Sequence, residues 1–198
     1  MFRMVSAIAF GLLFVGLGLH LLIFPCKLKV SLFKFRSKAE IINIISGIIC
    51  FGLLASFLGL FVTGFGPLLL GDKLHGYLLM FHATCAPVFI VCAGLLVLMY
   101  AGKHAFDLND ADAFKSGCSL KKGLNNRCWL TDTGLGAKVC FWVLAVLAVP
   151  LAMTMVLSML SLFGTEIQQC LFEMHRWIAL VFALIMFFEL YMLLRMNN

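Results

Sequence analysis

Five apolar runs, each long enough to cross a lipid bilayer, constrain this chain more than any other feature of its sequence. A helix needs about 20 mostly apolar residues to span the hydrocarbon core, and each run meets that length. Inside a bilayer the backbone must satisfy its own hydrogen bonds, which favours α-helices. We therefore predict an all-α integral membrane bundle, with spans at residues 4–24, 41–65, 75–101, 138–163 and 170–195 and short external turns at 66–74 and 164–170.

The composition leaves little room for a soluble domain. The chain has 198 residues, of which 63% are hydrophobic and 12% charged, whereas soluble domains are about half apolar and a quarter charged. The net charge is +6, but the chain has no folded soluble surface on which the basic residues could gather. We therefore expect no nucleic-acid partner. The eight cysteines form no CxxC pair, and most lie in apolar runs where a thiol behaves as a small hydrophobe.

The basic residues predict the orientation of the spans. The first run resembles a secretory signal in length, but five basic residues follow it and no small-residue cleavage site closes it. The segments 25–40 and 102–137 are rich in Lys and Arg, and such segments stay in the cytoplasm. This assignment leaves three basic residues outside, at Arg3, Lys73 and Arg176. We therefore predict five spans with the N-terminus out and the C-terminus in.

Two histidines lie at matching depths in this topology. His82 is in the third run and His175 opens the last one, and both are predicted near the outer face. Histidines at the same membrane depth on separate helices can bind one metal from opposite sides. Haem is the planar cofactor that best suits this arrangement in a helical bundle. Zinc fits less well, because no third ligand occurs at that depth. His75, seven residues before His82, is the alternative ligand, at the membrane interface.

Glu189 is the one acidic residue of the sequence that lies well inside an apolar run. It follows His175 by fourteen residues, so the two side chains share a helix face and lie roughly 21 Å apart along the axis. Ionisable groups in membrane helices are functional candidates. Two interpretations stay open: a carboxyl hydrogen-bonded to a neighbouring helix, and a proton relay from the cytoplasm toward a quinone.

Three segments resemble a known family. They are KHAFDLND (103–110), TDTGLGAKVCFW (131–142) and MHRWIALVFALIMFFELY (174–191). Together they resemble the cytochrome b, or gamma, subunit of respiratory formate dehydrogenase, and the related subunits of membrane-bound hydrogenases. The resemblance divides the chain into an extra N-terminal transmembrane helix with a basic cytoplasmic loop, residues 1–35, and a four-helix cytochrome b domain, residues 36–198.

The resemblance implies the ligands of one haem b. His82 and His175 match the axial ligands of the haem near the outer face. The family's second haem needs histidines at two positions that hold Ile45 and Glu189 here, so we expect a single haem. The family's quinone site lies beside that second haem, which leaves this site open to question.

The resemblance also implies partners and a location. We expect an iron–sulfur electron-transfer subunit with its catalytic subunit, membrane lipid, and menaquinone or ubiquinone as the electron partner. The chain would be a multi-pass protein of the bacterial inner membrane, without catalytic activity alone. Formate, hydrogen and other donors feed similar subunits. The alternatives are a haem-free membrane anchor or assembly subunit, and a small transporter using Glu189, which predicts internal repeats that the sequence lacks.

Overall fold

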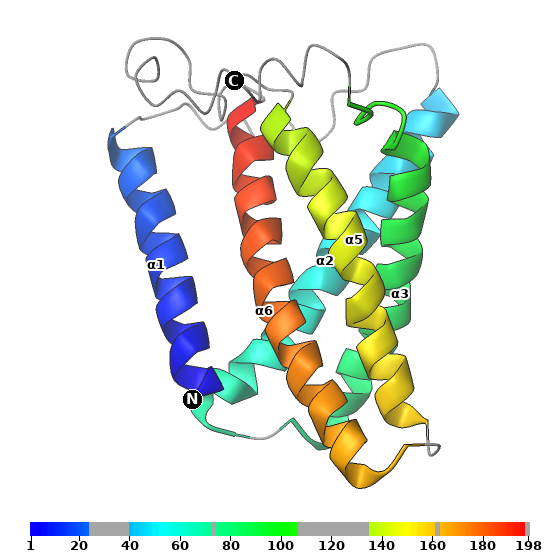
Figure 1. Cartoon of the computed structure of the whole chain (residues 1–198). Helices are drawn as coiled ribbons and strands as arrows, with labels where there is room; N and C mark the ends of the chain where they lie inside the picture. The colour runs from blue at the N-terminus through cyan, green and yellow to red at the C-terminus, as the bar shows by residue number, and fades with distance from the viewer. Residues whose placement is uncertain (24–39, 73, 107–134, 161–162, 197–198) are drawn as a thin grey trace.

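The described part of the chain is entirely helical. The structure is a computed structural model that describes residues 1–23, 40–72, 74–106, 135–160 and 163–196, and these contain no strand. They form five helices (Figure 1): α1 (Phe2–Ile23), α2 (Glu40–Leu70), α3 (Gly76–Tyr100), α5 (Leu135–Met159) and α6 (Thr165–Met196). All five are long and apolar enough to cross a membrane. This confirms the predicted all-α architecture of a multi-pass membrane protein.

Two helices extend into the segments that were predicted to be external turns. The segment 66–74 was expected to be a turn, but α2 continues through Pro67 to Leu70, because losing one hydrogen bond near a helix end is tolerated in membrane helices. The predicted turn at 164–170 is also largely helical. There α6 begins at Thr165 with Glu166 in its first turn, where an acidic side chain complements the helix dipole.

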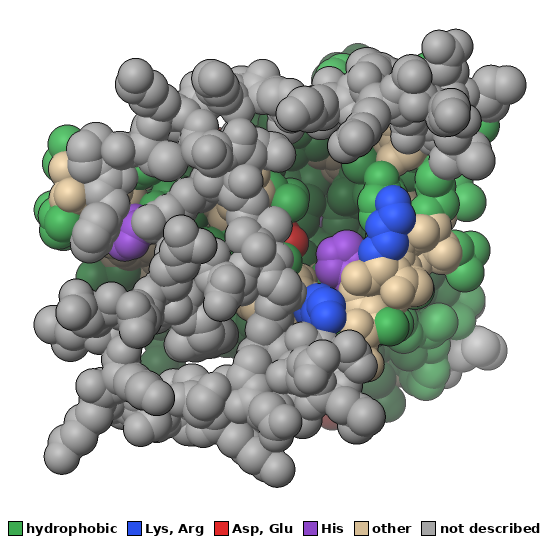
Figure 2. All heavy atoms as spheres, turned by 90° about the horizontal axis from the view of Figure 1, so that it is seen from above, with side chains coloured by type: hydrophobic (Ala, Val, Ile, Leu, Met, Phe, Trp, Pro, Cys, Tyr) green, Lys and Arg blue, Asp and Glu red, His purple; other side chains and the backbone are tan. Residues whose placement is uncertain are grey.

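The helices run between two ends of the bundle. The N-terminus lies at one end and the C-terminus at the other (Figure 1). We call these the outer end and the inner end, after the predicted orientation, which stays a prediction. Seen from the inner end, basic and histidine side chains lie among hydrophobic ones (Figure 2). There Trp142 of α5 donates an Nε1–H hydrogen bond of 2.9 Å to the carbonyl of His104, just after α3.

The bundle consists of two helical hairpins and a flanking helix. The α2–α3 and α5–α6 pairs make the most extensive helix contacts, and α3 contacts α5 to join the two hairpins. The first helix packs on α2 and α6. The α2–α3 contact depends on small residues. A Cβ atom at Gly59 would lie 3.1 Å from the Phe81 ring and 3.2 Å from the Cys85 sulfur. Glycine there lets the two backbones approach closely.

Phenylalanine rings fill the centre of the bundle. Phe10 of α1 meets Phe61 and Phe65 of α2 edge to face, with ring centroids 5.2 and 5.0 Å apart. Phe187 of α6 meets Phe61 in the same manner at 4.9 Å. Edge-to-face pairs of this kind stabilise beyond the area they bury. The rings therefore join α1, α2 and α6 at mid-depth.

The first helix is also held at both ends. At the outer end the Phe2 and Trp177 rings meet edge to face at 4.9 Å. Near the inner end His20 Nδ1 and the Tyr191 hydroxyl form a 2.5 Å hydrogen bond. These contacts hold α1 to α6 near both of its ends. The predicted boundary at residue 35 lies outside the described residues, so the division into two domains stays a prediction.

Gly59→Val should loosen the α2–α3 hairpin, because the added methyl groups would meet Phe81 and Cys85. Overpacking of this kind costs about 1–3 kcal/mol, which thermal unfolding in detergent would report as a lower Tm. The control is Gly94→Val, since a Cβ atom at Gly94 has nothing within 4 Å. Equal Tm values for the two variants would contradict the close packing.

Candidate functional site

A threonine–histidine pair crosses each hairpin near the outer end. In the first hairpin, Thr63 Oγ1 of α2 lies 2.8 Å from His82 Nδ1 of α3. In the second, Thr154 Oγ1 of α5 lies 3.3 Å from His175 Nδ1 of α6. In each pair the outward-running helix supplies the threonine and the inward-running helix the histidine. Both rings are thus engaged through the same nitrogen.

The partners of His175 fix its tautomer. Its Nδ1 also lies 3.2 Å from the Leu151 carbonyl oxygen, which only accepts hydrogen bonds. The Nδ1 atom must therefore carry the proton. In a neutral imidazole the other nitrogen then keeps its lone pair. His175 Nε2 is left as a potential metal ligand.

The partner of His82 Nδ1 is the Thr63 hydroxyl, which can donate or accept a hydrogen bond. The Thr63 hydroxyl donates to the Gly59 carbonyl at 2.7 Å, so its oxygen is free to accept from His82 Nδ1–H. Thr154 behaves alike, since it donates to the Pro150 carbonyl at 2.8 Å. A histidine that binds a metal almost always donates its other N–H to a neighbour, which orients the ring. Both histidines have this second interaction in place.

The surroundings hold both imidazoles within the membrane span. Thr63 and Thr154 are only 3% and 5% exposed, and the two histidines are half-buried. Gly64 leaves room beside the His82 ring, because a Cβ atom there would lie 3.3 Å from His82 Cε1. The two histidines that the sequence paired thus have matching surroundings, one in each hairpin.

His75, the alternative ligand, lies elsewhere. It is exposed and precedes the first residue of α3, with no hydrogen bond from its side chain to the helix end. Helix α3 begins at Gly76, so no helical turn directs the His75 ring into the bundle. The geometry therefore favours His82 over His75 as the candidate ligand of α3.

The described residues include no group of three or more His, Cys, Asp or Glu side chains that could enclose a metal ion. Haem needs less from the protein, because the porphyrin supplies four iron ligands and the chain supplies the axial ones. Two imidazoles with their Nδ1–H groups engaged and their Nε2 atoms unprotonated suit that role. The donor set thus fits haem.

Glu189 lies toward the inner end of the same helix. Its carboxyl contacts the Cys140 thiol of α5, which is placed to share a hydrogen bond with it. The Glu189 Oε2 atom is buried and has no hydrogen-bond partner among the described residues. An unmade hydrogen bond at a buried acceptor costs about 1–3 kcal/mol. The carboxyl is therefore ready to accept a donor from a further group.

The other position assigned to the family's second haem faces away. Ile45 of α2 is 46% exposed, so its side chain lies on the outside of the bundle. Its neighbour Ser46 is 9% exposed and forms a 2.5 Å hydrogen bond with the Tyr100 hydroxyl of α3. At this level α2 presents a serine, rather than Ile45, to the bundle interior.

Sequence reasoning missed the two threonines and Cys140. A signal for the threonines was present, because a hydroxyl in an apolar span must find a hydrogen bond. The nearest backbone carbonyls supply one in any helix, so the pattern alone gives no reason to expect a histidine partner. Cys140 had no signal, since a thiol in an apolar run packs as a hydrophobe.

Comparisons with known proteins assign no family to this chain. No family model, no curated protein and no solved structure matches the chain. The resemblance to cytochrome b subunits therefore rests on the three segments and on the histidines.

If His82 and His175 hold a haem, Thr63→Val should weaken its binding without removing a ligand, because valine keeps the shape but cannot accept the His82 Nδ1–H bond. Loss of such a supporting interaction typically costs 10–100-fold in metal affinity. Haem titration of the apoprotein, followed by absorbance, would measure it. The control is Thr84→Val, which removes an exposed hydroxyl of α3. Equal haem affinities for the two variants would show that Thr63 does not support haem binding.

Proposed function

We propose that this chain is a membrane cytochrome b subunit of a respiratory oxidoreductase complex in the bacterial inner membrane. It would pass electrons between an iron–sulfur partner subunit and the quinone pool through one haem b. The observation that carries the proposal is the matched pair of Thr–His hydrogen bonds, one in each hairpin, that leaves His82 Nε2 and His175 Nε2 available.

His82 and His175 would be the axial ligands of the iron. The haem, when bound, supplies one-electron transfer at a potential set by its ligands and surroundings. The chain's own part is to orient the two rings. Thr63 and Thr154 hold the Nδ1–H groups, and the apolar helices exclude water. Because each histidine belongs to a different hairpin, binding would also link α2–α3 to α5–α6.

Glu189 supports a second part of the function. A quinone that takes up two electrons also takes up two protons, and these must reach it through the protein. Glu189 lies roughly 10 Å from the inner end of α6, counted at 1.5 Å per residue. Its Oε2 atom has no partner among the described residues. We propose that this carboxyl accepts protons from the cytoplasmic side and delivers them to a bound menaquinone or ubiquinone.

The alternative function is a haem-free membrane anchor or assembly subunit. The long apolar helices and the ring contacts between α1 and its neighbours would serve an anchor equally well. An anchor has no need for two histidines whose Nδ1 atoms are each held by a threonine of the neighbouring helix. An absorption spectrum of the purified protein with and without dithionite separates the two functions.

His82→Ala and His175→Ala should each abolish the reduced haem spectrum, because one imidazole then remains for two axial positions. The variants should still insert, because alanine leaves the length and the apolar character of both spans in place. The control is His75→Ala, which removes an exposed histidine and should keep full haem content. Haem loss in His75→Ala with retention in His82→Ala would show that the ligand assignment is wrong.

Glu189→Gln should slow quinone turnover while leaving haem content unchanged. Glutamine keeps the shape and the hydrogen-bonding capacity of the side chain but cannot carry a proton, and proton transfer by a positioned side chain is worth about 10²-fold or more. Turnover with a soluble quinone, measured on the assembled complex, reports the effect. Glu173→Gln removes an exposed carboxyl of the same helix and serves as control. Unchanged turnover in Glu189→Gln would leave that residue a structural role only.

A further inference from the structure

A cluster of basic and aromatic side chains joins α3 to α5 at the inner end. The ring of His104, just after α3, stacks on the Phe141 ring of α5, with centroids 4.3 Å apart and planes 16° from parallel. Trp142 donates its hydrogen bond to the His104 carbonyl. The Lys103 ammonium lies over the Tyr100 ring, 4.6 Å from its centroid. These contacts hold Lys103 and His104 in defined positions beside α5.

Lys138 belongs to the same cluster. It lies in the first turn of α5, three residues before Phe141 and four before Trp142, and residues at these spacings are neighbours on a helix surface. Lys138 is therefore beside the two side chains that contact His104, one turn nearer the inner end. Its ammonium has three N–H donors, so it can bind an anion together with a protein group. Figure 2 shows basic and histidine side chains close together at this end of the bundle.

His104 adds a hydrogen-bond acceptor to these cations. Its Nδ1 atom lies 3.0 Å from the Tyr100 carbonyl oxygen, which only accepts, so Nδ1 carries the proton. In the neutral ring the Nε2 atom then keeps its lone pair and accepts a hydrogen bond. Two ammonium groups suit a phosphate, and the imidazole nitrogen suits a hydroxyl. The cluster therefore matches a ligand that has both groups.

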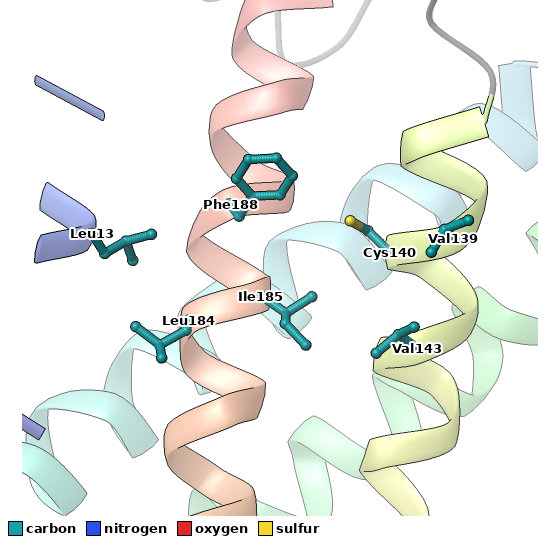
Figure 3. A pocket seen from close by; sticks show the side chains of 7 residues that line it. All are labelled: Leu13, Val139, Cys140, Val143, Leu184, Ile185 and Phe188. Carbon is teal, nitrogen blue, oxygen red and sulfur yellow. The ribbon is translucent and has the colours of Figure 1, made fainter. Parts of the chain in front are cut away.

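The cluster is placed where a lipid headgroup would lie. Tyr and Trp side chains are typical of the level at which membrane helices meet water. Farther along α5, Val146 and Val149 are 66% and 60% exposed, and Val149 follows Lys138 by three helical turns, so the two share a face. An apolar pocket of about 360 Å³ also adjoins these turns, lined by Val139 and by side chains of α1 and α6 (Figure 3). A molecule with its head at the cluster has apolar surface beside it for its chains.

We propose that this inner-end lipid site, made of Lys103, His104, Lys138 and Trp142, binds an anionic phospholipid whose headgroup carries hydroxyls, as phosphatidylglycerol does. The phosphate lies between the two ammonium groups, and a glycerol hydroxyl donates to His104 Nε2. Basic clusters beside membrane helices attract anionic headgroups in this way. A zwitterionic lipid fits less well, because its own ammonium balances the phosphate charge. The bound lipid would reinforce the junction of the two hairpins, and this inference does not rest on the proposed function.

The phosphate contacts are tested by native mass spectrometry of the full-length protein, titrated in detergent with phosphatidylglycerol or phosphatidylethanolamine. The wild type should retain one phosphatidylglycerol per chain in preference to phosphatidylethanolamine. Lys103→Gln and Lys138→Gln should each lower its affinity about fivefold, the contribution of one basic residue near a membrane surface. The control is Arg176→Gln, which removes an exposed basic side chain at the outer end and should bind like the wild type. An equal loss in the control, or unchanged affinity in both lysine variants, would overturn the site.

The hydroxyl contact is tested with phosphatidylethanol, which has the same charge but no hydroxyl. The wild type should prefer phosphatidylglycerol about fivefold, the effect of one hydrogen bond. His104→Phe keeps a ring to stack on Phe141 and should abolish this preference. The ratio of the two lipids on one preparation does not depend on the fraction of protein that folds. No preference in the wild type, or the same preference in His104→Phe, would overturn the headgroup assignment.

Inorganic phosphate separates a lipid site from a general anion site. An excess of phosphate ions should leave phosphatidylglycerol bound, because the acyl chains hold the lipid against α5. Displacement by phosphate alone would overturn the assignment to a lipid.

Discussion

The hydrogen bond between a threonine and a histidine across each hairpin is the interaction on which the site depends. Inside a bilayer a polar side chain without a partner is costly, so an imidazole in an apolar helix must be paired. Thr63 and Thr154 meet this need with their oxygens, because their own hydrogens are given to backbone carbonyls. The pairing holds both rings with their Nε2 atoms free. Two hairpins built in the same way thus present the same nitrogen.

The sequence predicts the spans well because their length and apolarity are imposed by the bilayer itself. All five predicted runs correspond to helices of the structure, and the errors are at the ends. Helix α2 passes through Pro67, and α6 starts before its apolar run, because helix ends at an interface are governed by capping and dipole effects rather than by hydropathy. The orientation of the bundle remains a prediction from the distribution of Lys and Arg.

The site was predictable in part. His82 and His175 could be paired from depth alone, since each lies in the outer part of a span that runs in the same direction. Their threonine partners could not, because Thr63 lies nineteen residues before His82 and the contact depends on how the hairpin closes. That Ser46 faces the bundle interior while Ile45 faces outward also needed the structure, because it depends on the rotation of α2. The contact of Cys140 with Glu189 depends on the register between α5 and α6.

We propose that one iron is held between His82 and His175. The measurement that tests it most directly combines a haem-to-protein ratio, from the pyridine haemochrome assay, with electron paramagnetic resonance of the oxidised protein. The account predicts one haem per chain with the low-spin signal of two histidine ligands. Two haems per chain, no haem, or a high-spin signal from a single axial histidine would contradict it.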